Sequence, residues 1–166
     1  MIMIYVYIAG PLFSEADIRQ RKYEARQIEA VLAKQQQPYF IANPIDLPLD
    51  LEQVPAAADI FRLDYQHICQ ANVFFLELAS NDSGTLAELG IIIERYMQGR
   101  EIGIYPVFYD LRLSRNSPSG VECPVGFNSF TVGCLRANDI VIYESFAQAL
   151  TQFDLDLKSG MYGKQI

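Results

Sequence analysis

Short apolar runs alternate along the chain with longer stretches in which apolar side chains recur every three or four positions. The short runs, rich in β-branched and aromatic residues, predict buried strands at residues 3–9, 39–42, 72–78, 101–108 and 139–143. The longer stretches predict amphipathic helices over residues 15–36, 57–70 and 85–98, with a last helix that begins at Ser145. Prolines predict a loop over 44–56, and a polar segment predicts a longer loop over 110–126.

Strands that alternate with helices predict a parallel sheet, because a parallel connection has to cross back over the sheet and usually does so as a helix. We therefore expect residues 1–166 to form one α/β domain of the doubly wound, flavodoxin- or Rossmann-like class. Its sheet should have five parallel strands, with helices on both faces. Proteins of this fold class bind ligands beyond the carboxyl ends of the strands, so we expect the site to be formed by residues 7–13, 43–46 and 79–88.

Composition narrows the classes of partner. The net charge of −7 disfavours binding to nucleic acid or to an anionic membrane surface. No apolar run reaches the length of about 18 residues that a membrane-spanning helix needs, and we expect the apolar opening segment to be the first strand, not a signal peptide. Cys69, Cys123 and Cys134 form no CxxC pair, so we expect reduced thiols in a cytoplasmic protein, with Cys69 and Cys134 inert in the core.

The segment with the most chemical information joins the third predicted strand to the following helix, at residues 81–90. It holds two carboxylates, Asp82 and Glu88, and a small residue, Gly84, that lets a polar ligand approach the backbone. Glu88 stands among apolar neighbours and suits a nucleophile or an acid–base group. A structural alternative stays open, because Thr85 and Glu88 fit a helix capping box and Asp82 fits an Asx turn.

Asp64 and His67 lie one turn apart on the helix before the third strand. Asp64 is either a solvated residue at the flank of the helix or a third carboxylate that protonates or orients a leaving group. The single histidine has no partner at metal-ligand spacing, so we expect it to pack or to pair with Asp64, and we expect no metal site. The chain has neither a G-x-G-x-x-G nor a G-x-x-x-x-G-K-[ST] motif, which disfavours dinucleotide binding and P-loop phosphoryl transfer.

Several of these pieces occur together in one order: Tyr7-Ile8-Ala9-Gly10-Pro11, then Asp64, then Asp82-x5-Glu88-Leu89-Gly90, then Phe127-Asn128. In this order they resemble the nucleoside 2-deoxyribosyltransferase family, over residues 5–146. The resemblance implies an enzyme that moves 2-deoxyribose between purine or pyrimidine bases by double displacement. A glutamate carboxylate attacks the anomeric carbon and expels the base, and a second base then opens the deoxyribosyl ester, with retention overall.

The resemblance also implies roles for single residues. Glu88 is the expected nucleophile, Tyr7 holds it through its hydroxyl, and Asp64 manages the proton of the base. The residues expected to bind substrate are Asp82, at a sugar hydroxyl, Asn128 and Phe130, at the site of a neighbouring subunit, and Asp46, Gly10 and Gly84. The expected partners are 2′-deoxynucleosides, free nucleobases and further copies of the chain, in an oligomer built from dimers and as large as a hexamer. No cofactor is expected.

Two alternatives remain at this point. The chain departs from the family pattern in the 110–126 loop and in its tail, so base preference stays open. A related enzyme that hydrolyses 2′-deoxynucleoside 5′-monophosphates is one alternative, with Ser14, Ser83 and Arg19 available for the phosphate, although Asp82 would repel that group. A non-catalytic nucleoside-binding module, in which the same residues only bind ligand, is the other.

Overall fold

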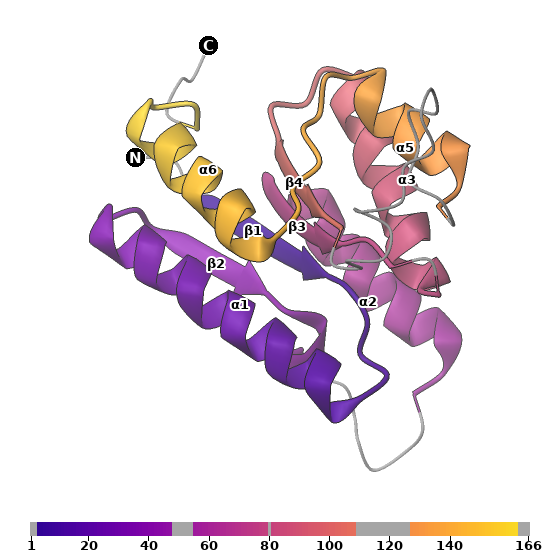
Figure 1. The fold of residues 1–166 in the computed structure, drawn as a ribbon. Coiled ribbons are helices and arrows are strands. Elements are labelled where there is room, and N and C mark those ends of the chain that lie inside the picture. The colour runs from indigo at the N-terminus through magenta and orange to yellow at the C-terminus, as the bar shows by residue number, and fades with distance from the viewer. Residues whose placement is uncertain (1–2, 48–54, 80, 109–126, 163–166) are drawn as a thin grey trace.

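The computed structural model describes residues 3–47, 55–79, 81–108 and 127–162. Within these residues the sheet has four parallel strands, β1 (Ile4–Ala9), β2 (Tyr39–Ala42), β3 (Val73–Glu77) and β4 (Gly103–Val107), in the order β2-β1-β3-β4 (Figure 1). The chain builds outward from β1 to β2 and then returns to the other side of β1 for β3. The connections after β1 and β3 therefore leave toward opposite faces and open the crevice in which doubly wound folds bind ligands.

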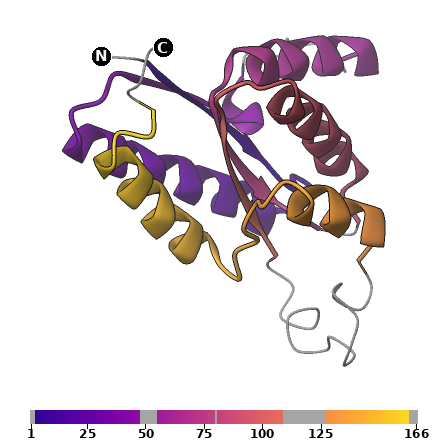
Figure 2. The same ribbon diagram turned by 90° about the horizontal axis from the view of Figure 1, so that it is seen from above.

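Helices cover both faces of this sheet (Figures 1 and 2). On one face α1 (Glu15–Lys34) lies beside α6 (Phe146–Lys158), and on the other lie α2 (Ala57–Gln70), α3 (Ser83–Met97) and α5 (Ser129–Arg136). A short 3-10 helix, Pro44–Asp46, follows β2. The doubly wound α/β class is thus confirmed, and the helix predicted over 57–70 and the strand predicted over 39–42 have the observed bounds.

Two apolar clusters fill the space between the sheet and its helices. Ile4, Val6 and Ile8 of β1 belong to the cluster under α1 and α6, whereas Tyr7 and Ala9 belong to the cluster under α2 and α3. This division follows from the period of two along a strand, which sends successive side chains to opposite faces. Tyr7 therefore enters the face of the sheet on which α3 lies.

The fifth strand predicted at 139–143 is wrong. Among the described residues this segment pairs with β4 at one position, where Tyr143 N–H donates to Pro106 O (2.9 Å) and Phe108 N–H donates to Tyr143 O (2.9 Å). Asp139 has a left-handed backbone (φ 56°) just after α5, so the start of the segment is used to end that helix. On the β4 side, Pro106 has no N–H with which to extend the pairing.

Two further expectations from the sequence need correction. No helix was expected at α5, whose Val132 and Leu135 are buried although its residues favour helices weakly. Cys69 is exposed on α2 and does not lie in the core, while Cys134 is half-buried. The predicted 110–126 loop lies outside the described residues. In the described part of the chain no helix has both the length and the apolar character needed to cross a membrane.

Candidate functional site

The hydroxyl of Tyr7 donates a hydrogen bond to Oε1 of Glu88 over 2.7 Å. Tyr7 is fully buried in β1, and Glu88 projects from the second turn of α3. The capping-box alternative for Glu88 is wrong, because the N–H of Thr85 donates to Asp82 and the carboxylate of Glu88 is bound by Tyr7. A strand in the middle of the sheet and a helix above it thus fix one carboxylate through a single bond.

Asp82 is the N-cap of α3. Its Oδ1 accepts hydrogen bonds from the N–H groups of Gly84 (3.1 Å) and Thr85 (3.2 Å), and its Oδ2 accepts from the Thr85 hydroxyl (2.7 Å). Asp82 therefore makes the local turn that its sequence context allowed as an alternative role. These bonds fix the start of α3, and with it the place from which Glu88 projects less than two turns later.

Glu88 and Asp64 line one pocket of about 220 Å³ between α2 and α3. The described lining residues are Ala57, Ile60, Phe61, Asp64, Tyr65 and Ile68 of α2, together with Gly84, Ala87, Glu88 and Ile91 of α3. The walls are mostly apolar, and Phe61 and Tyr65 stack with their ring centroids 5.5 Å apart. Such a pocket suits a flat, partly apolar ligand that also meets two carboxyl groups.

Burial raises the pKa of Glu88 to about 7, and the charges of Asp64 and Asp82 act in the same direction. The hydrogen bond from Tyr7 acts against them, because it stabilises the ionised carboxylate. Burial also raises the pKa of Asp64 to about 6. The pKa of Tyr7 is raised by burial and by the adjacent Glu88 charge, so its phenol stays neutral and remains a donor.

Two carboxyl groups that titrate between pH 6 and pH 7 in one pocket hold about one proton between them in that range. The pocket can therefore present one ionised carboxylate and one neutral carboxylic acid at the same time. Displacement at an anomeric carbon uses such a pair, with one group as nucleophile and the other as acid. The order of the two pKa values places this proton on Glu88 more often than on Asp64. The hydrogen bond from Tyr7 stabilises the ionised form of Glu88 and fixes its orientation, and this geometry favours Glu88 as the nucleophile and Asp64 as the acid.

The structure places the other residues expected to bind substrate outside this pocket. Gly10 lies at the end of β1, next to a buried arginine. Asp46 is exposed after β2 and accepts a hydrogen bond from Asn43 (3.1 Å). Asn128 is the exposed N-cap of α5, and Phe130 is 84% exposed in its first turn. Of the expected set, Asp64, Glu88 and Gly84 line the pocket, and Tyr7 reaches it through its bond to Glu88.

His67 has a packing role. Its Nδ1 shares a hydrogen bond with the hydroxyl of Tyr5, and its ring stacks on Phe40 with an angle of 5° between the planes. Burial lowers the pKa of His67, which favours the neutral ring. Within the described ranges, no three His, Cys, Asp or Glu side chains are arranged to hold a metal ion. Of the two roles considered for His67, the structure therefore supports packing.

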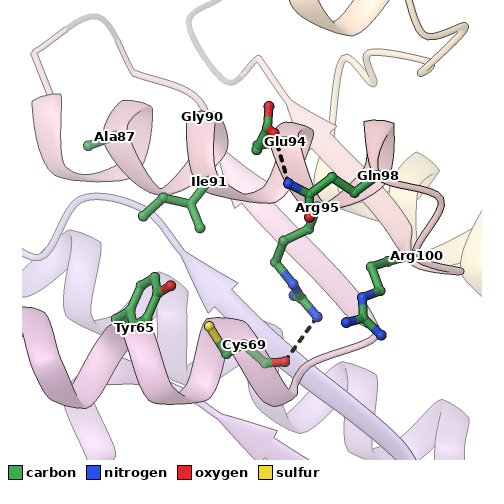
Figure 3. A pocket seen from close by; sticks show the side chains of 9 residues that line it. All are labelled: Tyr65, Cys69, Ala87, Gly90, Ile91, Glu94, Arg95, Gln98 and Arg100. Carbon is green, nitrogen blue, oxygen red and sulfur yellow. Dashed lines mark hydrogen bonds between the residues drawn. The ribbon is translucent and has the colours of Figure 1, made fainter.

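A larger groove of about 760 Å³ adjoins the pocket on the same two helices (Figure 3). Arg95 of α3 extends across to α2, where its guanidinium donates to the carbonyl oxygens of Cys69 (3.0 Å), Ala71 (3.2 Å) and Ile68. These bonds satisfy carbonyl groups that the end of a helix leaves without partners. Glu88 is not among the described residues that line the groove. Despite its size, this groove joins two helices and holds no member of the carboxyl pair.

Sequence reasoning missed two features near the site. Phe61 and Tyr65 lie one helical turn apart and form an aromatic wall of the pocket, which the helical spacing alone could have indicated. Arg21 and Glu24 are buried on α1 although both are charged. Their spacing continues the apolar stripe through Ile28, but charged side chains are rarely buried, so the pattern alone predicts that both lie on the solvated face.

Comparisons with known proteins place the chain in a family. A family model described as nucleoside 2-deoxyribosyltransferase matches residues 6–107. This range runs from Val6 in β1 to Val107, the last residue of β4. An uncharacterized protein of Ureaplasma parvum serovar 3, UU063, is 32% identical over 95 residues. The match covers 54% of this chain and 60% of that protein, so the chain spans less than two thirds of this relative.

Solved structures share the fold. A conserved protein from Enterococcus faecalis V583 has a TM-score of 0.68 at 21% identity, over 93% of this chain and 99% of its own. The 2-deoxyribosyltransferase from Leishmania mexicana has a TM-score of 0.54 at 19% identity, over 90% and 96% of the two chains. The enzyme from Bacillus psychrosaccharolyticus has a TM-score of 0.51 at 20% identity, over 87% and 89%. These likenesses show the fold, and the family model shows that the chain belongs to the nucleoside 2-deoxyribosyltransferase family.

Proposed function

We propose that this protein is a nucleoside 2-deoxyribosyltransferase that transfers 2-deoxyribose from a 2′-deoxynucleoside to a free purine or pyrimidine base. The observation that carries the proposal is the hydrogen bond from Tyr7 to Glu88, at the pocket that Glu88 shares with Asp64. The bond holds one carboxylate oxygen in place, so the nucleophile is oriented before the substrate arrives.

The proposed reaction has two steps. In the first, a carboxylate oxygen of Glu88 bonds to C1′ of the donor while the bond from C1′ to the base nitrogen breaks. The electron pair leaves with the base, and Asp64 supplies the proton that neutralises it. In the second, a nitrogen of the acceptor base bonds to C1′, the Glu88 carboxylate leaves, and Asp64 takes up the proton that the acceptor loses. Two inversions at C1′ give retention overall.

The charges around the pocket support this chemistry. The transition state carries positive charge on the sugar, and the ionised carboxylate of Glu88 lies where it can stabilise that charge. With a pKa of about 6, Asp64 changes its protonation near neutral pH, as a group that both donates and accepts a proton must. Donors without a 2′-hydroxyl form the cation more easily, so we expect 2′-deoxynucleosides to react well ahead of ribonucleosides.

The test is a chromatographic assay of the purified chain with thymidine or deoxyinosine as donor and adenine as acceptor. Appearance of deoxyadenosine supports the proposal, and Glu88→Ala should abolish it. Glu94→Gln changes an exposed glutamate further along α3 and is the matched control, which should keep wild-type transfer. Release of free base without a new nucleoside would show that the protein is a hydrolase and would contradict the proposal. Ligand binding without any reaction would leave a binding module.

Two of the three residues considered for a 5′-phosphate, Ser14 and Arg19, have other contacts, which supports nucleosides over nucleotides as donors. Ser14 caps α1 in a reciprocal capping box with Asp17. Arg19 is exposed and lies 4.0 Å from Glu15 of the same helix. In the same assay, 2′-deoxynucleoside 5′-monophosphates should therefore be poor donors, and a preference for them would contradict this assignment.

We propose in addition that a second copy of the chain completes the site. Asn128 and Phe130 are exposed at the start of α5, and an aromatic ring exposed at 84% beside an amide suits an interface between copies. Asn128→Ala should weaken donor binding. Mixing N128A chains with E88A chains should then restore some transfer, because one intact site can form from the two. No restoration, once exchange of subunits has been demonstrated, would contradict a shared site.

A further inference from the structure

A buried arginine joins the ends of two strands at the carboxyl edge of the sheet. Arg21 of α1 is 1% exposed, and its Nη1 donates to the carbonyl oxygen of Ala9 (3.2 Å), the last residue of β1. Its Nη2 donates to Oε1 of Glu24 (3.0 Å) and to Oε2 of Glu77, the last residue of β3. A guanidinium suits this place because its planar fork binds several acceptors at once.

Gly10 provides the space for this guanidinium. A Cβ atom on residue 10 would lie 1.5 Å from Nη1 of Arg21 and 3.0 Å from Cβ of Glu77. The first distance is shorter than any real Cβ contact and the second is tight, so the guanidinium keeps this position only with glycine at residue 10. This explains Gly10 through the buried arginine, with no need for a substrate to approach the backbone there.

The backbone carbonyl of Arg21 also binds the loop that follows β2. Nδ2 of Asn43, which directly follows β2, donates to the carbonyl oxygen of Arg21 (3.3 Å) and to the carboxylate of Asp46 (3.1 Å). Residue 21 thus contacts the chain at or next to the carboxyl ends of β1, β2 and β3. These are the connections that build the ligand crevice in a doubly wound fold.

The two strand ends that Arg21 binds also position Tyr7 and Glu88. Ala9 comes two residues after Tyr7 in β1, and Glu77 leads into the turn that places Asp82 and then Glu88. A shift of β1 against β3 would therefore move the Tyr7 hydroxyl relative to the Glu88 carboxylate. Arg21 itself is not among the described residues that line the pocket, so it can act on the reaction only through these strands.

We infer that Arg21 is a positioning residue, which sets the Tyr7–Glu88 bond by clamping the ends of β1 and β3 from the opposite face of the sheet. The inference rests on the proposed function for its effect on transfer, although the clamp itself can be measured without turnover. Two carboxyl groups fix the position of the guanidinium, since Nη2 of Arg21 donates both to the almost fully buried Glu24 and to Glu77.

Arg21→Lys is the informative variant, because lysine keeps the charge but lacks the planar fork that binds Ala9 and Glu77 through two separate nitrogens. In the wild-type chain, the bond from Tyr7 lowers the pH at which Glu88 titrates. In R21K this bond weakens, so Glu88 should titrate at a higher pH, measured by NMR of carbon-13-labelled glutamate carboxyl groups with E88Q to assign the signal. The kcat for transfer should fall roughly 10- to 100-fold, with a smaller change in KM, and the acid limb of the kcat profile should move to higher pH.

Ile28→Val is the matched control, because Ile28 lies on the same buried face of α1 but contacts neither strand end through a hydrogen bond among those described. It should lower the melting temperature and leave the Glu88 titration unchanged. An unchanged titration in a folded R21K chain would overturn the inference. If R21K does not fold, Gly10→Ala takes its place, since its methyl group pushes against Nη1, and the same two results apply.

The two proposals can fail separately. If the wild-type chain transfers no deoxyribose, the proposed function fails while the NMR titration still reports on the clamp. If transfer occurs and R21K leaves both the Glu88 titration and the pH profile as they were, the clamp fails alone. A double-mutant cycle adds a direct check of the contact: Gly10→Ala should cost less stability in the R21K background than in the wild type, and equal effects would overturn the contact.

Discussion

Replacement of Glu88 by glutamine should stabilise the protein at alkaline pH although it removes the proposed nucleophile. Burial raises the pKa of Glu88 from 4.5 to about 7, so the folded chain binds this proton more tightly than the unfolded chain does. The stability that belongs to this group is therefore fully present below pH 4.5 and is lost as the pH rises to about 7. Glutamine has nearly the same shape and does not titrate.

The size of the effect follows from the shift. At about 1.4 kcal/mol for each pH unit, an ionised Glu88 destabilises the folded state by roughly 3 kcal/mol above pH 7. Water that enters the open pocket lowers this figure, so we expect E88Q to gain about 1 to 3 kcal/mol at pH 8. For a chain of this length the gain corresponds to a melting temperature about 3 to 10 °C higher.

The assay is thermal unfolding of E88Q and of the wild type across the range from pH 4.5 to pH 8, checked for reversibility. The difference in melting temperature should be small at the acid end and should grow until the pH passes about 7. Glu94→Gln, at an exposed position of the same helix, is the control and should show no such growth. A variant no more stable than the wild type at pH 8 would refute the argument from burial, and transfer activity in E88Q would refute the role of Glu88.

Three other changes test the site and its frame. Tyr7→Phe removes the hydrogen bond that lowers the pKa of Glu88. The kcat for transfer should fall, and the acid limb of its pH profile should move to higher pH. An acid limb that does not move would contradict the effect of Tyr7 on Glu88. Asp64→Asn removes a charge that raises the pKa of Glu88, so the acid limb of the pH profile of kcat should move to lower pH. Transfer should fall most for donors whose base leaves only when protonated, and an equal loss for every base would argue against Asp64 as the acid. Arg95→Met removes the bonds to the carbonyl end of α2 and should lower the free energy of unfolding by about 1 to 3 kcal/mol in urea, and no loss would show that these bonds add little.

Local pattern predicted most of the fold, and the misses have causes that lie elsewhere in the chain. Residues 139–143 have the composition of a strand, but the proline at 106 in the neighbouring strand lacks the donor that a longer pairing needs. The helix over Ser129–Arg136 is short, contains Gly133, and is stabilised by packing of its buried side chains more than by helix propensity. Neither the proline at 106 nor the packing that stabilises Ser129–Arg136 is visible in the segment whose structure it decides.

The candidate site shows the same limit. Asp82 and Glu88 could be recognised because they are close in sequence, and local pattern could not decide between a capping role and a chemical one. The contact that separates these roles joins residues 81 positions apart, Tyr7 and Glu88. Arg21 was missed because a charged side chain is assigned to solvent unless its partners are known, and one of those partners, Glu77, lies on a strand 56 positions away.

The two walls of the pocket differ in how freely they can change. Along α2, every residue of which is described, Ile68 is the one buried side chain, yet this helix supplies six of the described pocket residues. The α3 wall is anchored by four buried residues and by the bond from Tyr7. Substitutions on the exposed wall, at Ile60 or Phe61, therefore carry little penalty in folding. Under the proposed function, lineages of this protein can diverge in the bases they accept by changing α2, while the opposite helix keeps a single chemistry in place.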